Sequence, residues 1–224
     1  MKKQIEDNNT EMTNVISRTE EFINGNQKTL ITALIAIVVV VVAIVALNKL
    51  YFQPRQIEAS EALFAAEQWF DAGEYQKALD GDDTFSGLLG VIDSYGSTRA
   101  GNLAKYYAGA AYLHMGDYTE ALHWLKKYKG KDTFTGTLTE MMIGDAEMEL
   151  DNAAQAAKHY AKAARMSDNI VTTPTALFKA GMAELKEGNK AAALKNFNRV
   201  KDQYPESTEW REIDKYISLV ENMQ

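Results

Sequence analysis

Three histidines are the residues best suited to acid–base or metal chemistry in this chain, and their surroundings do not assemble a site. His114, His123 and His159 show no His-Glu-x-x-His pattern, and none lies beside a nucleophile with an orienting acid. Cysteine is absent, which excludes disulfides, thiol catalysis and cysteine-ligated metals. The glycines form neither G-x-G-x-x-G nor a phosphate-binding loop. We therefore predict a non-catalytic protein with no cofactor and no metal site.

An apolar run at residues 30–47 is the most strongly patterned stretch of the chain. Its eighteen residues are Leu, Ile, Val and Ala except for Thr32. As a helix they extend about 27 Å, close to the thickness of a bilayer's hydrocarbon core. Together, the Leu, Ile and Val residues favour insertion by about 4–8 kcal/mol. We predict a transmembrane helix over residues 29–48 rather than a signal peptide, because the run is longer than a signal core and follows a long polar segment.

Residues 1–28 precede the predicted span and carry a helical stripe of apolar residues at positions 12–23. This stripe predicts an amphipathic helix, which either lies on the membrane surface or docks onto another membrane protein. Basic residues are more frequent before the span, which predicts a cytoplasmic N-terminal segment. Those before the span are Lys2, Lys3, Arg18 and Lys28, and those close after it are Lys49 and Arg55.

A short neck is predicted at residues 49–56. Tyr51 and Phe52 suit the headgroup level, and Pro54 discourages further helix. Residues 57–224 are long enough for one domain with a sizeable core. Beyond the span the chain carries twenty-six acidic and twenty basic residues, so nucleic acid is an unfavourable partner. The lack of cysteine is compatible with an oxidising or a reducing compartment.

Four similar turns recur in this domain, and each is followed by an alanine five residues later. They contain Gly73, Gly116, Asp151 and Gly188, at spacings of 43, 35 and 37 residues. The pattern resembles the tetratricopeptide repeat, whose period is 34 residues. The resemblance implies an all-α solenoid of about four helix pairs, in which small residues let paired helices approach and large residues fill the gaps. Such residues are Gly109, Gly144 and Gly181, and Leu125, Tyr160 and Phe197.

Two segments depart from the regular repeat. Residues 80–83, Asp-Gly-Asp-Asp, interrupt the second helix of the first repeat and account for the long first spacing. Such an insertion either marks a binding site or is neutral. Residues 207–222 follow the last repeat and predict a helix that caps its open end. The apolar face expected for this helix consists of Trp210, Ile213, Ile217 and Val220.

The repeat resemblance also implies a concave groove lined by the first helix of each pair. The groove positions are Leu63, Phe70, Tyr106, Leu113, His114, Leu138, Met141, Met148, Phe178, Met182 and Leu185, with Glu67, Ala110 and Asp145 among them. Repeats that grip a C-terminal carboxylate use Lys, Asn and Arg here, so that mode is not expected. A largely apolar, Met-rich groove suits a partner helix or an unfolded chain. The alternative is that a tight superhelix or the last helix buries these residues.

The order of amphipathic helix, single span, neck and repeat domain resembles the YfgM-type ancillary subunits of the bacterial SecYEG translocon. The segments that carry the resemblance are Glu21-Phe22 with Asn26, residues 85–95 with Gly101-Asn102-Leu103-Ala104, and residues 108–113. The resemblance implies an inner-membrane protein with a periplasmic repeat domain. It implies SecYEG and a PpiD-type membrane-anchored chaperone as partners, and secreted chains as clients. Two alternatives remain open, namely a tethered adaptor of another envelope assembly and a cytosol-facing docking scaffold.

Overall fold

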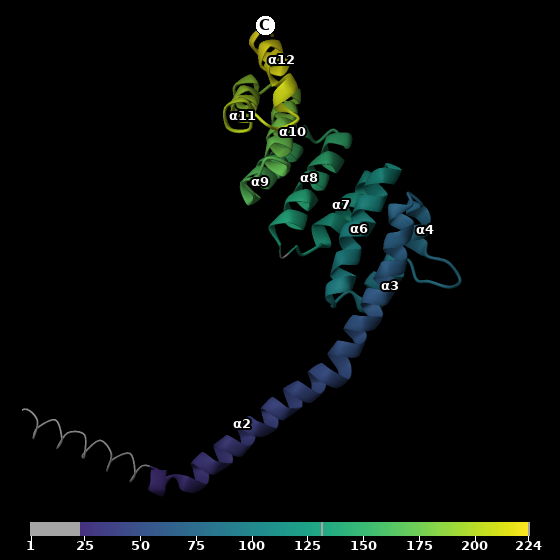
Figure 1. The fold of residues 1–224 in the computed structure, drawn as a ribbon, viewed down its shortest axis with the longest axis vertical. Helices are drawn as coiled ribbons and strands as arrows, with labels where there is room; N and C mark the ends of the chain where they lie inside the picture. The colour runs from purple at the N-terminus through teal and green to yellow at the C-terminus, as the bar shows by residue number, and fades with distance from the viewer. Residues whose placement is uncertain (1–22, 131, 224) are drawn as a thin grey trace, which may run out of the picture. The chain divides into compact units, whose positions relative to one another are not determined.

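A computed structural model describes residues 23–130 and 132–223 of the chain. Within these ranges the regular structure is helical, apart from one isolated bridge between Gly81 and Ser86. The predicted all-α class is confirmed for these residues: an apolar helix precedes a stack of helical hairpins, which ends in a further helix (Figure 1). The chain divides into residues 1–54 and 55–224, which we describe separately. The amphipathic helix predicted at positions 12–23 lies, except for residue 23, outside the described residues.

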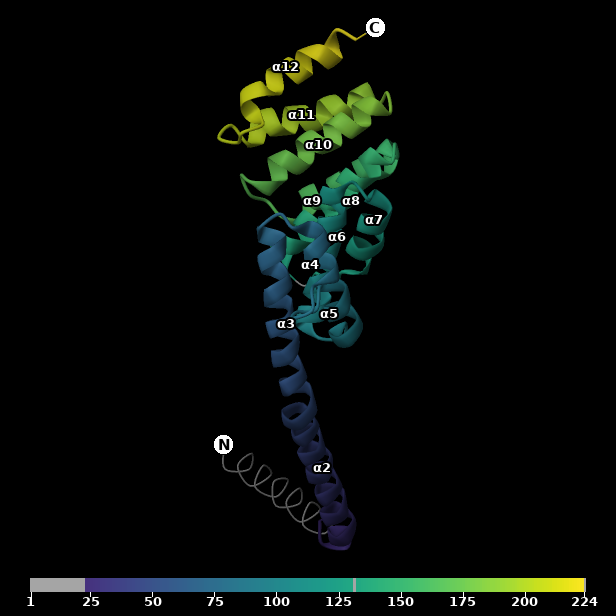
Figure 2. The same ribbon diagram turned by 90° about the vertical axis from the view of Figure 1, so that its right-hand side faces the viewer.

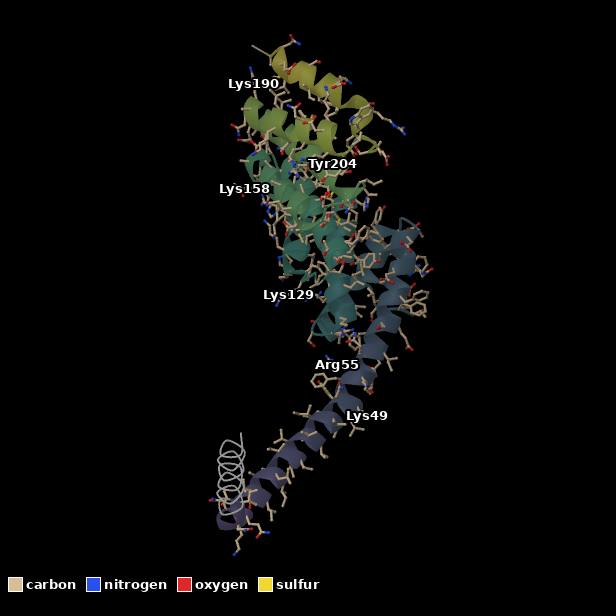
Figure 3. All side chains as sticks on the ribbon, turned by 60° about the vertical axis from the view of Figure 1, so that its left-hand side comes forward. Lys49, Arg55, Lys129, Lys158, Lys190 and Tyr204 are labelled. Carbon is tan, nitrogen blue, oxygen red and sulfur yellow. The ribbon has the colours of Figure 1, made fainter. Side chains whose placement is uncertain are left out.

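The first unit contains helix α2 (Gln27–Leu47) and the short π-helix η1 (Asn48–Phe52). Apolar side chains project from all sides of α2, and none of its residues is buried (Figure 3). The hydroxyl of Thr32 donates to the Lys28 carbonyl at 2.8 Å, so the one hydroxyl among residues 30–47 is satisfied inside the helix. Among the described residues, this helical stretch is the one long and apolar enough to cross a bilayer.

Pro54 does not end the helical run, contrary to the neck predicted at residues 49–56. Helix α3 (Gln53–Asp71) begins one residue earlier and includes the proline. Proline lacks the backbone N–H that an α-helix uses for its i to i−4 hydrogen bond, so it is tolerated inside a helical run where that bonding is already interrupted. The π-helical turn before it is a wider variant of the helix that interrupts the regular i to i−4 bonding. The chain therefore stays helical across the predicted neck.

The second unit is built from four successive helical hairpins and a last helix, stacked in chain order (Figures 1 and 2). The first pairs α3 with α4 (Tyr75–Asp80) and α5 (Leu88–Tyr95). The others pair α6 (Arg99–Met115) with α7 (Tyr118–Lys127), α8 (Thr133–Glu149) with α9 (Ala153–Met166), and α10 (Thr172–Lys186) with α11 (Lys190–Gln203). The last helix is α12 (Trp210–Glu221).

Each of the three regular hairpins places a glycine of its first helix against a large side chain of its second. A β-carbon added to the glycine would lie too close to that side chain, so only glycine permits the observed helix separation. The distances from the added carbon are 2.5 Å to Leu125 Cγ at Gly109, 2.5 Å to Tyr160 Cε1 at Gly144, and 2.3 Å to Phe197 Cε1 at Gly181.

The turns inside the hairpins share a left-handed backbone residue. Gly73, Gly116 and Gly188 have φ of +79°, +82° and +78°, which glycine adopts without a steric cost. Asp151 takes the equivalent position in the third hairpin with φ of +63°. Its carboxylate accepts an ion pair from Lys186 Nζ at 2.6 Å. Aspartate is one of the few other residues that tolerate this conformation, so the third turn keeps its geometry without glycine.

The second helix of the first hairpin is split, as predicted. Helix α4 ends at Asp80, and α5 begins at Leu88. Between them, Asp82 Oδ1 accepts hydrogen bonds from the backbone amides of Thr84 and Phe85, at 2.9 and 3.0 Å. These bonds, with the isolated bridge, give the inserted loop a defined turn.

Helix α12 covers the end of the last hairpin through Ile213, Ile217 and Val220, which are buried in the same core as Phe197. This confirms the predicted capping helix. Trp210, which we expected on the buried face, is instead 41% exposed. It stands at the first position of the helix, where its indole Nε1 donates to the Lys201 carbonyl at 3.0 Å.

The Gly181 contact predicts a specific destabilisation. Gly181→Ala should lower the free energy of unfolding by about 1–3 kcal/mol, because the new methyl group collides with a fully buried ring. Combining it with Phe197→Leu should cost less than the sum of the two single changes, because the smaller side chain leaves room. Thermal unfolding of the detergent-solubilised chain, followed by circular dichroism, measures this, and Ala191→Ser on an exposed position is the control. Strict additivity would contradict the packing argument.

Candidate interaction groove

A hollow of about 440 Å³ lies between the second, third and fourth hairpins. We call it the central groove. Helices α6, α7, α8, α9 and α10 each contribute to it, so its shape depends on how successive hairpins stack. Its lining consists of Leu113, Tyr118, Asp145, Met148, Glu149, Tyr160, Lys179 and Met182.

Asp145 is the centre of a polar cluster in the central groove. The Tyr160 hydroxyl donates to Asp145 Oδ1 at 2.6 Å, and Lys179 Nζ donates to both carboxylate oxygens at 2.7 Å. Tyr160 is 3% exposed, and burial raises its pKa, with Asp145 adding to the effect. The phenol therefore remains a neutral donor at physiological pH. Three side chains from three helices hold one another in a fixed arrangement.

Glu149 lies four residues after Asp145 on the same helix, so both carboxylates face the same side of α8. Unlike Asp145, it has no hydrogen-bond or ion-pair partner among the described residues. The apolar part of the lining is supplied by Leu113, Met148 and Met182. The groove thus combines apolar walls with one paired carboxylate and one solvent-exposed carboxylate.

Three of the predicted groove residues, Leu113, Met148 and Met182, line the central groove. Two others are buried: Leu63 is 5% exposed and Met141 is 8% exposed, and both belong to the core. Both side chains act in packing: Leu63 belongs to the core of the first two hairpins, and Met141 belongs to the core of the last two hairpins and α12.

Phe70 and His114 contact each other and neighbouring rings near the first hairpin. The Phe70 ring lies 5.4 Å from Tyr75, 5.2 Å from Tyr107 and 6.0 Å from His114. Tyr75 and His114 stack with an interplanar angle of 3° at 4.7 Å. These contacts join α3, α4 and α6 into an aromatic cluster. The cluster ties the first hairpin to the second.

Four predicted groove residues remain, and all are partly buried: Tyr106, Leu138, Phe178 and Leu185. The Tyr106 ring is 5.4 Å from Tyr107 and 5.6 Å from Tyr128. The Phe178 ring is 4.7 Å from Tyr216 of α12, so the last helix covers it, as one of our two interpretations anticipated. Leu185 is partly buried against the same core as Phe178, and Leu138 is half-buried on α8.

The sequence reasoning did not assign Tyr118, Glu149 or Lys179 to the groove, and it counted Tyr160 as packing only. One signal was present: Asp145 and Lys179 are 34 residues apart, which is one repeat period. Residues one period apart lie on adjacent first helices, so opposite charges at this spacing predict an ion pair. The groove is consequently more polar than the largely apolar surface that we expected.

Glu67 has an unfavourable electrostatic environment beside the aromatic cluster. Burial raises its pKa, and the nearby charge of Asp71 raises it further, while a hydrogen bond from the Tyr107 hydroxyl opposes these effects. The same burial, with the charge of Glu67 next, raises the pKa of Tyr107 to about 12. Tyr107 is therefore a neutral donor at physiological pH, and Glu67 is a carboxylate that the fold holds at a cost.

Comparison with known proteins gives one family match, in the fourth hairpin. Residues 175–207, within α10, α11 and the following turn, match the tetratricopeptide repeat family. No curated protein matches the chain. The described residues contain no group of three or more His, Asp or Glu side chains arranged to hold a metal. The tetratricopeptide repeat is a fold that binds protein partners, so the fold and groove define a helical interaction scaffold with one apolar helix suited to a membrane.

The environment of Glu67 predicts a pH-dependent stability difference. Its folded-state pKa is raised, so the stabilisation gained by protonation is present below the ordinary pKa of 4.5 and is lost as pH rises through the folded value. Glu67→Gln should therefore raise the midpoint of thermal unfolding at pH 7 and have little effect near pH 4. Comparing melting curves of the full chain at both pH values tests this. A lower midpoint for the variant at pH 7 would show that the charge stabilises the fold.

Proposed function

We propose that this protein is an accessory subunit of the bacterial Sec translocon, anchored in the inner membrane by one helix. Its repeat domain stands in the periplasm, where it docks a PpiD-type chaperone and receives or passes on secreted chains. The observation that carries the proposal is the presence, in one chain, of a fully exposed apolar helix and an interaction groove built from three helical hairpins. We choose the Sec translocon as the assembly because the sequence resembles that of YfgM-type subunits.

The apolar helix and the central groove suit two different tasks, contact with the membrane and binding of a partner protein. The apolar helix α2 suits contact with lipid and with the membrane helices of a partner, because it exposes apolar side chains all around. The central groove suits a segment of a partner protein, because apolar walls and polar groups alternate there. The segment 1–28 extends the membrane-side contact in this proposal. Residues 57–224 form the partner-binding domain.

The orientation can be tested with single cysteines, because the chain has none of its own. We expect Lys158→Cys on the exposed side of α9 to react with a membrane-impermeant maleimide in intact spheroplasts (Figure 3). Asn24→Cys, on the other side of α2, should react only after the membrane is opened. The reverse labelling pattern would establish a cytosol-facing scaffold.

The assembly can be tested by affinity purification of the tagged full chain in mild detergent. We expect SecY and a PpiD-type chaperone in the purified complex. The double change Leu113→Lys and Met148→Lys should reduce recovery of the chaperone about tenfold, because two positive charges enter the groove wall, and should leave SecY unchanged. Met166→Lys, outside the groove lining, is the control.

Circular dichroism must show the same helix content in all three proteins. Absence of SecY from the wild-type complex would assign the protein to another envelope assembly. Unchanged recovery of the chaperone with the double variant would remove the central groove from the docking mechanism.

A further inference from the structure

The charged side chains that line the central groove favour the binding of a cation. Lys179 is the one basic residue of its lining, and both oxygens of Asp145 already neutralise it. Tyr160 donates its only hydroxyl proton to the same carboxylate. The Glu149 carboxylate has no such partner among the described residues and is open to solvent. An entering group therefore meets one unmatched carboxylate and no unmatched base.

Further carboxylates lie beside the groove at the start of α7. Asp117 caps this helix by accepting a hydrogen bond from the Glu120 amide at 3.1 Å, and the next residue, Tyr118, lines the groove. Burial raises the pKa of Tyr112 on α6, and the charges of Glu120, Asp80 and Asp117 raise it further. Asp117 therefore places a further carboxylate directly beside a residue that lines the groove.

The walls fit the carbon stem of a long basic side chain. Leu113, Met148 and Met182 offer apolar contact, and methionine side chains adapt their shape to what they touch. The ring of Tyr118 adds an aromatic face, which attracts cations. A hollow of about 440 Å³ has room for such a side chain together with part of its backbone.

We propose that the central groove binds a lysine or arginine side chain presented by an exposed segment of a partner protein. Glu149 receives the charged group, Met148 and Met182 hold its stem, and the Asp145 cluster fixes the floor of the site. This inference rests on the interaction role proposed above and specifies the chemistry of the partner. A carboxylate ligand is disfavoured, because Lys179 is already paired and Glu149 would repel it.

Two matched peptides provide the test. Each contains three copies of a four-residue unit, Ala-Leu-Lys-Ser in one and Ala-Leu-Glu-Ser in the other, with acetylated and amidated ends. The full chain, labelled at the methyl carbons of its nine methionines and held in detergent micelles, is titrated with each peptide by NMR. The signals of Met148 and Met182 report on the groove, and those of Met166 and Met223, exposed elsewhere, serve as references.

We expect the lysine peptide to shift the Met148 and Met182 signals saturably and the glutamate peptide to leave them unchanged. Glu149→Gln should weaken the lysine peptide about five- to tenfold, as expected for loss of a charge-assisted contact. Glu187→Gln removes the same charge from an exposed residue outside the lining, and should change the affinity less than twofold.

Equal shifts with both peptides, shifts confined to the reference methionines, or unchanged affinity in Glu149→Gln would each overturn the inference. Recovery of SecY with the tagged Glu149→Gln chain separates this result from the proposed function. If the peptides fail while SecY is still recovered, the translocon role stands and the basic-side-chain inference falls. If SecY is never recovered but the peptides behave as expected, the groove chemistry stands and the assembly is a different one.

Discussion

The close approach of paired helices at a glycine is the constraint on which the rest of the domain depends. In each regular hairpin the glycine precedes its large partner by sixteen residues, as in Gly109 with Leu125 and Gly181 with Phe197. This spacing fixes the length of the first helix, the turn and the second helix together. It also fixes which faces remain for the next hairpin, and thereby the position of the central groove. The first hairpin lacks such a pair, and there the second helix is split into α4 and α5.

The fold was largely predictable because its determinants are local in sequence. Turn residues with left-handed backbone, alanines five residues later and small residues at the crossings can each be recognised from spacing. Asp151 shows that the turn does not require glycine, because an aspartate at this position adopts the same left-handed conformation. Pro54 is a residue whose effect on the helix could not be predicted from the sequence pattern. The sequence shows a helix breaker, but whether a proline stops a helix depends on the hydrogen bonding of the turn before it, which here is π-helical.

The groove was only partly predictable, because its lining depends on contacts between hairpins. The groove positions taken from the repeat pattern include Leu113, Met148 and Met182, which line the central groove. A rotation of the helix by one residue decides, however, whether Met141 faces a partner or the core. Phe178 has the right position, yet Tyr216, more than thirty residues later, covers it. The Asp145 cluster needs three helices at once. Side-chain partners of this kind follow from the stacking of hairpins and are not encoded in any single segment.

Helix α12 also determines where the stack stops. Ile213, Ile217 and Val220 occupy the face to which a further hairpin would otherwise add, and the outer side of the helix is exposed at Arg211, Asp214 and Lys215. A solenoid without such a helix would present its bare apolar end to the first hairpin of another molecule, which is a head-to-tail contact that does not close on itself. The helix therefore blocks the growth of a head-to-tail filament at this end. Because Ile213, Ile217 and Val220 are already buried, such a contact has no apolar face to form on at this end of the domain.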